Sequence, residues 1–183
     1  LLEKMRVAVS GACGRMGQEI CRTILQEENL ELVEAFDLQD RGEDLGVVLG
    51  KQPLGINIEE LTPENLNRRR PAVLVDFTTP MVVMHNIEIA LQCGVRPVVG
   101  TTGITQVDLA RISQQVEKFS LSAIIAPNFA LGAVLMMKFA ATAARYFSQA
   151  EIIELHHDKK IDAPSGTALK TAEMIAIERR AEP

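Results

Sequence analysis

The stretch Arg6-Val7-Ala8-Val9-Ser10-Gly11-Ala12-Cys13-Gly14-Arg15-Met16-Gly17 decides the fold. Its first five residues are mostly apolar and predict a short β-strand. Three glycines follow at intervals of three, and an apolar pattern through Ile20 and Ile24 predicts a helix after them. Residues 30–37 are apolar again and predict a second strand. A strand, a glycine-rich turn, a helix and a second strand together indicate a β-α-β unit.

The glycine-rich turn, residues 11–17, has the chemistry of a dinucleotide site. Its spacing is Gly-x-x-Gly-x-x-Gly rather than the commoner Gly-x-Gly-x-x-Gly. Glycines let the backbone approach a pyrophosphate, and the start of a helix stabilises its charge. Asp37 follows Gly17 by 20 positions, where an acid accepts a hydrogen bond from an adenosine ribose hydroxyl. A turn that merely permits close packing of the helix on the strand is the alternative interpretation.

Cys13 lies inside the same turn, where a helix start can activate a thiol. No basic partner is evident in the sequence, so we expect Cys13 to be a small filler residue.

Strands and helices alternate through the next part of the chain. Apolar runs at residues 72–77, 95–99 and 121–126 predict further strands. Helix starts are expected at Thr62-Pro63 and at Thr78-Thr79-Pro80, whereas residues 38–60 are expected to form a loop. This alternation predicts an α/β fold with a Rossmann-like, doubly wound parallel sheet.

The candidate cofactor site consists of residues that follow the strands, because ligands of doubly wound sheets bind at the carboxyl ends of the strands. Its members are Gly11, Ala12, Cys13, Gly14, Arg15, Met16, Asp37, Phe77, Gly100, Thr101, Thr102, Ala126, Pro127, Asn128 and Phe129. Turn chemistry alone explains any one of them, and phenylalanines belong to the core more often than to a cofactor site. The set as a whole predicts a crevice lined for a cofactor.

A second candidate site follows a helix expected over residues 130–147 and a strand expected over residues 150–153. It is Glu154-Leu155-His156-His157-Asp158-Lys159-Lys160-Ile161-Asp162-Ala163-Pro164-Ser165-Gly166-Thr167-Ala168, and a helix follows it. Because Ser165-Gly166-Thr167 opens that helix, free N–H groups and the positive end of the dipole would face a bound anion. Lys160 adds a cation. The stretch predicts a pocket for a carboxylate or phosphate, with a proton donor beside it.

Other interpretations of this second site remain open. Ser165 can be only a helix cap. His156 and His157 would point to opposite faces of a strand, which argues against a shared metal ion, and we expect none. Ser165 also lacks the Gly-x-Ser-x-Gly pattern of a nucleophilic serine.

Composition narrows the class of protein. The chain has 183 residues, 47% of them hydrophobic, so it can bury a full core. Its formal net charge of −5, without a basic stripe, argues against nucleic acid as the main partner. The longest apolar stretch is interrupted by Lys138 and Arg145, so we expect no membrane span. Three cysteines without metal spacing indicate a reducing compartment such as the cytoplasm, or a plastid if a transit peptide has been removed.

Four stretches together resemble one family, the dihydrodipicolinate reductases. They are Val9–Gly17, Asp76-Phe77-Thr78, Gly100-Thr101-Thr102-Gly103, and Glu154-Leu155-His156-His157 through Ala163–Ala168. The last stretch is the most specific of the four. The resemblance implies NAD(P)H-dependent reduction of 4-hydroxy-tetrahydrodipicolinate to tetrahydrodipicolinate in lysine and diaminopimelate biosynthesis, by a homotetramer.

The resemblance also implies a role for each residue of the second site. His156 resembles the family's proton donor and acceptor, and Lys160 resembles its proton donor. His157 and Ser165-Gly166-Thr167 resemble the clamp for a substrate carboxylate. The cofactor is expected to be NADH or NADPH. Leu38 favours NADH, because it follows Asp37 where some relatives carry an arginine for a 2′-phosphate.

These expectations divide the chain into two parts. Residues 1–126 are expected to form the dinucleotide-binding domain. Residues 127–183 are expected to form the N-terminal part of an α+β domain for substrate binding and tetramerisation, with its C-terminal remainder missing. A truncated, non-catalytic dinucleotide-binding module is the alternative function, and a Rossmann-type reductase of a semialdehyde or keto acid is a third.

Overall fold

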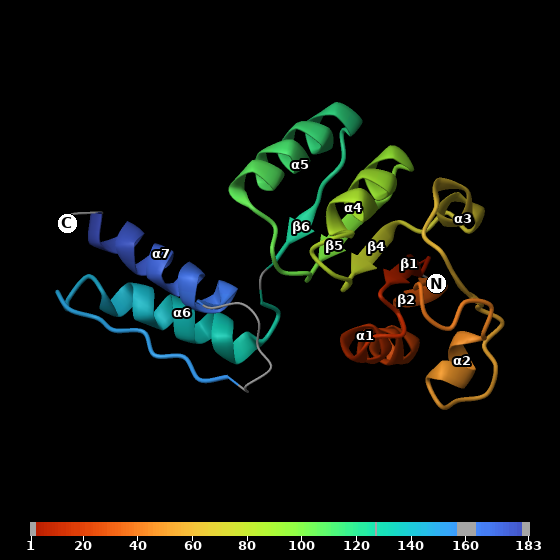
Figure 1. Ribbon diagram of the computed structural model, residues 1–183, viewed down its shortest axis with the longest axis horizontal. Helices are drawn as coiled ribbons and strands as arrows, with labels where there is room; N and C mark the ends of the chain where they lie inside the picture. The colour runs from red at the N-terminus through yellow and green to blue at the C-terminus, as the bar shows by residue number, and fades with distance from the viewer. Residues whose placement is uncertain (1–2, 127, 157–163, 181–183) are drawn as a thin grey trace. The chain divides into compact units, whose positions relative to one another are not determined.

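The computed structural model describes residues 3–126, 128–156 and 164–180 (Figure 1). The chain forms two compact units, Leu1–Ala126 and Pro127–Pro183. Each unit has buried residues of its own.

A six-stranded sheet is the centre of the first unit, with the strand order β3-β2-β1-β4-β5-β6. Every neighbouring pair is parallel. The strands are β1 (Met5–Ser10), β2 (Leu30–Phe36), β3 (Ile58–Glu59), β4 (Val73–Asp76), β5 (Arg96–Val99) and β6 (Ile124–Ile125). The strand order reverses direction between β1 and β4, which is the switch point of a doubly wound sheet. The predicted Rossmann-like α/β fold is therefore confirmed.

Helices cover both faces of this sheet (Figure 1). They are α1 (Arg15–Gln26), α2 (Leu45–Val48), α3 (Pro63–Arg68), α4 (Val83–Gln92) and α5 (Gln106–Phe119). On one face, Cys21 and Ile24 of α1 and Leu45 of α2 pack with Val7 and Val9 of β1. On the other face, α3, α4 and α5 bury their apolar sides against β1, β4 and β5. The two faces alternate along each strand, because successive side chains point to opposite sides.

Local sequence signals fix two of the helix starts. The Thr62 side chain accepts a hydrogen bond from the N–H of Asn65, and Pro63 occupies the first turn of α3. Thr105 and Asp108 form a reciprocal capping box at the start of α5. The predicted start at Thr62-Pro63 is thus confirmed.

Three predicted boundaries in the first unit were wrong. The helix expected from Thr78-Thr79-Pro80 begins only at Val83, because Thr78 is held in hydrogen bonds at the end of β4. The expected loop at residues 38–60 contains α2 and β3, which are too short to give a periodic signal. The strand expected over residues 121–126 is limited to β6.

The second unit contains two helices that lie side by side, α6 (Leu131–Ala143) and α7 (Gly166–Arg180) (Figure 1). Met137 and Ala141 of α6 and Thr171 and Ile175 of α7 are buried. Residues 150–153 were predicted as a strand but form none. A strand needs a neighbour for its N–H and C=O groups, and no described residue of this unit supplies one. Within the described ranges, no helix has the length and apolarity to cross a membrane.

Glu34 of β2 is an unusual member of the core of the first unit. Its side chain is 7% exposed, and its Oε2 atom has no hydrogen-bond partner among the described residues. It lines a cavity of about 90 Å³ together with Glu59, Arg68 and Arg69. Burial raises the pKa of Glu34 to about 7, although Arg68 and Arg69 oppose the shift and Glu59 adds to it. Glu34 therefore gains a proton on folding at mildly acidic pH.

Replacing Glu34 with glutamine should change how stability depends on pH. Between its ordinary pKa of 4.5 and about 7, the folded protein binds one proton more than the unfolded chain. The free energy of unfolding of the parent should therefore fall across this window, by up to about 3 kcal/mol, and stay low above it. Glu34→Gln cannot ionise, so it should be more stable than the parent at pH 8 and similar to it at pH 5.

Urea unfolding at pH 5, 6, 7 and 8 measures this difference. Glu31→Gln is the matched control, because Glu31 lies on the same strand but is exposed. Parallel pH profiles for Glu34→Gln and the parent would contradict the prediction.

Candidate functional site

A cavity of about 500 Å³ opens at the carboxyl ends of the strands in the first unit. It lies at the switch point, where β1 ends in Ser10-Gly11 and β4 is followed by Phe77-Thr78-Thr79. Asp37, which follows β2, and His85 and Asn86 of α4 also belong to its polar lining. Cofactor pockets of α/β proteins commonly occupy this position.

The three positions of the turn require glycine for different structural reasons. Gly11 has a φ of +81°, and a Cβ atom there would clash with the carbonyl oxygen of Phe77. A Cβ atom at Gly17 would clash with the carbonyl oxygen of Gly11. Close packing, the alternative considered above, therefore explains these two glycines. Gly14 is exposed, lines the cavity and begins α1 without a side-chain cap, so the first N–H groups of α1 are available to an anion.

Asp37 is fixed opposite the glycine-rich turn. Its Oδ2 atom accepts a hydrogen bond of 2.9 Å from the N–H of Cys13, and its Oδ1 atom accepts one of 3.0 Å from the N–H of Gln39. An ionised carboxylate has about four acceptor positions, so these two bonds leave capacity for a hydroxyl group of a ligand. The turn and the acid are therefore joined before any ligand binds.

The thiol of Cys13 is not activated. Burial, and then the carboxylates of Asp37 and Asp40, raise the pKa of Cys13 to about 12. A thiol with such a pKa stays neutral near pH 7 and is a poor nucleophile. This result agrees with the interpretation of Cys13 as a small filler residue.

Asp76, at the end of β4, is the centre of a buried polar network. Its carboxylate is 1% exposed. Oδ1 accepts hydrogen bonds from the Thr78 N–H at 3.1 Å, the Thr78 hydroxyl at 2.8 Å and the Thr101 hydroxyl at 2.8 Å. Oδ2 accepts from the side-chain amide of Asn86 at 2.7 Å. The network ties the loops after β4 and β5 to the first turns of α4.

The predicted cofactor residues of the first unit are thus sorted into two groups. Gly11, Gly14, Asp37 and Phe77 line the cavity. The others lie outside its lining, namely Ala12, Cys13, Arg15, Met16, Gly100, Thr101, Thr102 and Ala126. Thr101 is 7% exposed and its hydroxyl points inward to Asp76, so a ligand can meet only its backbone. Packing explains why a glycine occupies position 100, because a Cβ atom there would clash with the Phe77 ring.

Sequence reasoning missed several residues of the cavity lining. Thr79, His85 and Asn86 line it, together with Glu60, Leu61 and Val82. A signal was present for two of them: His85 and Asn86 are adjacent polar residues in the otherwise mostly apolar helix α4. This helix follows β4 directly in the chain, so its first turns face the switch point.

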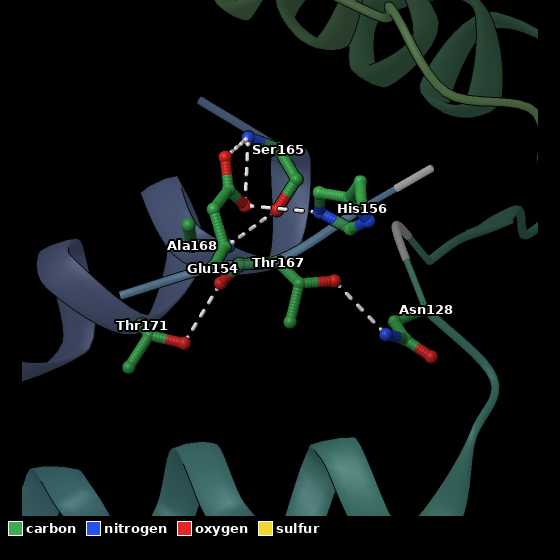
Figure 2. A network of polar contacts seen from close by, with 7 residues as sticks. All are labelled: Asn128, Glu154, His156, Ser165, Thr167, Ala168 and Thr171. Carbon is green, nitrogen blue, oxygen red and sulfur yellow. Dashed lines mark hydrogen bonds and ion pairs between the residues drawn. The ribbon is translucent and has the colours of Figure 1, made fainter. Parts of the chain in front are cut away.

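A second cluster of polar residues lies at the start of α7 in the second unit (Figure 2). The Glu154 carboxylate accepts hydrogen bonds from the Ser165 N–H, at 2.9 Å to Oε1 and 3.2 Å to Oε2. His156 Nε2 lies 3.3 Å from the Oε2 atom of Glu154. The hydroxyl and N–H of Ser165, and then His156, hold the pKa of Glu154 below its usual range. The cluster therefore keeps an ionised carboxylate between the imidazole and the helix start.

The Ser165 side chain caps α7, since its Oγ atom accepts a hydrogen bond of 3.1 Å from the N–H of Ala168. This hydroxyl therefore serves as a helix cap. Thr167 is held by the side-chain amide of Asn128, which donates a 2.9 Å hydrogen bond to its hydroxyl, as Figure 2 shows. The Oδ1 atom of Asn128 in turn accepts from the N–H of Ala130, just before α6. Asn128 thus connects the start of α6 to the start of α7.

The remaining predicted residues belong to the second unit. Gly166 begins α7, and Phe129 is 50% exposed in the second unit. Pro127, His157 and Lys160 lie outside the described residues. Among the residues that the structure does describe, no three His, Cys, Asp or Glu side chains gather in a way that could hold a metal ion.

Two family models together match almost the whole chain. A family model described as "Dihydrodipicolinate reductase, N-terminus" matches residues 5–129, and one described as "Dihydrodipicolinate reductase, C-terminus" matches residues 132–183. The boundary between the matches falls close to the boundary between the two compact units.

Individual relatives agree with the family models. The chain is 51% identical over 180 residues to a 4-hydroxy-tetrahydrodipicolinate reductase of Desulfitobacterium hafniense, covering 98% of the chain and 67% of the relative. It is 49% identical to the enzyme of that name from Moorella thermoacetica, covering 96% of the chain and 66% of the relative. The chain thus spans about two thirds of the length of these curated relatives.

One solved structure is similar to this chain in both sequence and fold. It is the dipicolinate-bound dihydrodipicolinate reductase from Paenisporosarcina sp. TG-14, at 48% sequence identity and a TM-score of 0.77. The match covers 98% of the chain and 68% of the solved chain.

Replacing Thr101 should test the buried network around Asp76. Thr101→Val keeps the shape but removes the hydroxyl that donates to Asp76 and accepts from the Thr78 N–H at 2.9 Å. Leaving these buried groups short of a partner should lower the free energy of unfolding by about 1–3 kcal/mol. Thr101→Ser keeps the hydroxyl and should cost clearly less.

Urea unfolding of the two variants gives the comparison. Thr102→Val is the control, because the neighbouring Thr102 is exposed. Equal losses for Thr101→Val and Thr101→Ser would show that the hydroxyl is not what stabilises the network.

Proposed function

Because the chain belongs to the dihydrodipicolinate reductase family, we propose that it carries the cofactor site and the catalytic residues of a 4-hydroxy-tetrahydrodipicolinate reductase. The reaction is the NAD(P)H-dependent reduction, to tetrahydrodipicolinate, of the cyclic, unsaturated imine dicarboxylate that forms when 4-hydroxy-tetrahydrodipicolinate loses its hydroxyl group as water. The observation that carries this proposal is the cluster at the start of α7, where His156 lies beside a helix N-terminus. Such a terminus suits a carboxylate, and the imidazole suits proton transfer.

The cavity of the first unit is the proposed cofactor site. The exposed Gly14 and the uncapped start of α1 fit a pyrophosphate, because N–H groups there have no intrahelical acceptor. Asp37 fits a ribose hydroxyl. A bound nicotinamide would supply the hydride, and the protein residues bind and orient it.

The second unit is the proposed substrate site. The N–H groups of Gly166 and Thr167 at the start of α7 bind a substrate carboxylate, and His157 adds a further contact to it. When a hydride adds to C4 of the conjugated imine, electron density moves onto the ring and a proton must follow. His156 is the proposed proton donor and acceptor, and Lys160 the proposed proton donor. The positive charge of Lys160 also stabilises the electron-rich ring.

We propose NADH as the preferred cofactor. Asp37 and Glu60 place two carboxylates in the cavity lining, and both repel a 2′-phosphate. The nearby Arg41 is already engaged, since its guanidinium lies 2.7 Å from a carboxylate oxygen of Glu60. Leu38, which follows Asp37 in the lining, offers no positive charge.

We also propose a homotetramer in the cytoplasm, in agreement with the family resemblance. Leu131, Leu135 and Phe139 share one face of α6, because they recur at every fourth position. They are 72%, 40% and 67% exposed, so this face is available to a partner subunit. Light scattering on the purified protein gives its molar mass. The relatives described above come from bacteria, which supports a cytoplasmic location over a plastid one.

Leu38→Arg should shift the cofactor preference toward NADPH. An arginine beside Asp37 can form a charge-assisted pair with the 2′-phosphate, so the ratio of NADPH to NADH affinity should rise about tenfold or more. Leu38→Gln, which lacks the charge, is the control. Dissociation constants from calorimetric titration measure both ratios, and an unchanged ratio in Leu38→Arg would remove position 38 from cofactor selection.

Calorimetric titration of NADH, followed by pyridine-2,6-dicarboxylate, tests the proposed function. We expect NADH to bind first and the planar dicarboxylate to bind only to the NADH complex. Pyridine-2-carboxylate, with one carboxylate, is the control ligand and should bind more weakly. Binding of NADH alone would favour the non-catalytic module instead, and binding of neither ligand would contradict both readings.

A further inference from the structure

Glu154 connects two parts of the proposed substrate site, as Figure 2 shows. One carboxylate group receives the Ser165 N–H and lies 3.3 Å from His156 Nε2. Ser165 immediately precedes α7, whose first residues are the proposed carboxylate clamp. A single side chain thus contacts both the proposed proton donor and the start of the proposed anion site.

We infer that Glu154 is a positioning residue, which holds His156 and the first turn of α7 in one fixed arrangement. The inference rests on the proposed function of His156 and of the turn. Glu154 itself need not touch the substrate, because its carboxylate is already occupied by groups of the protein.

The contact with His156 selects an orientation of the imidazole. The Glu154 carboxylate can only accept, so His156 presents an Nε2–H group to it. The Nδ1 atom is then the ring nitrogen that remains to exchange a proton with a substrate. An acid that orients a catalytic imidazole through its second nitrogen is a recurring arrangement in enzymes.

The contact with Ser165 holds the Glu154 carboxylate at the start of α7. Glu154 and Ser165 are 11 positions apart, and the segment between them contains His157 and Lys160. The start of α7 also stabilises the negative charge of Glu154 through the helix dipole. The same carboxylate is therefore fixed beside the first residues of α7, which belong to the proposed carboxylate clamp.

A purely structural role is the competing explanation. Glu154 would then only cap α7, and its loss would loosen the helix start without changing the imidazole. Two readouts separate the explanations: hydrogen exchange at the amides of Ser165 and Ala168, and the ¹⁵N chemical shifts of the His156 ring. Only a positioning role predicts a change in the ring.

The experiment compares Glu154→Ala and Glu154→Gln with the parent chain. Glutamine keeps an oxygen that can accept from both Ser165 and His156, whereas alanine keeps none. Glu151→Ala is the matched control, because Glu151 is an exposed acid three positions earlier. NADH affinity should stay unchanged in all variants, since the proposed cofactor cavity is lined by the first unit.

The parent should show the shifts of an imidazole protonated at Nε2. Glu154→Ala should lose this preference, and Glu154→Gln should retain most of it. Loss of the Glu154 contacts with His156 and Ser165 should weaken pyridine-2,6-dicarboxylate binding to the NADH complex about tenfold in Glu154→Ala, in line with one lost charge-assisted hydrogen bond.

Unchanged ring shifts in Glu154→Ala would overturn the inference, even if hydrogen exchange at the start of α7 became faster. A failure of the proposed function would give a different set of results from a failure of this inference. The parent would then bind NADH but no dicarboxylate, while the ring shifts would still report whether Glu154 orients His156.

Discussion

The buried carboxylate of Asp76 is the interaction on which the first unit most depends. It sits at the end of a central strand and accepts hydrogen bonds from three other residues, Thr78, Asn86 and Thr101. A buried charge is costly unless hydrogen bonds compensate it, so each donor is constrained in turn. This constraint fixes the loops after β4 and β5, delays the start of α4 to Val83 and shapes one wall of the cavity.

The two units use charge in different ways. In the first, the charged side chains of the cavity lining are the carboxylates of Asp37 and Glu60, and the helix start of α1 supplies the positive end of a dipole. In the second, a carboxylate of the protein already binds the start of a helix and draws an imidazole to it. The first arrangement suits a ligand that carries its own phosphates, and the second suits a small substrate that must be placed beside a proton donor.

Much of the fold was predictable from the sequence, because the strands are apolar and glycines mark the turn between β1 and α1. The position of Asp37 at the carboxyl edge of the sheet was also predictable, since Asp37 directly follows a recognisable strand. Other features depend on contacts between distant residues. The inward direction of the Thr101 hydroxyl requires knowledge of Asp76, and the contribution of His85 to the cavity requires the start of α4. Residues 150–153 have the apolar pattern of a strand, but no described partner pairs with them.

The hydrogen bond between Asp37 and the N–H of Cys13 has a kinetic consequence. Because the acid and the glycine-rich turn are already joined, binding of a dinucleotide requires little rearrangement of these two parts of the protein and costs little free energy for it. Association is then governed by encounter and orientation, which differ little between similar ligands. Discrimination between related dinucleotides should consequently reside in how long each one stays bound.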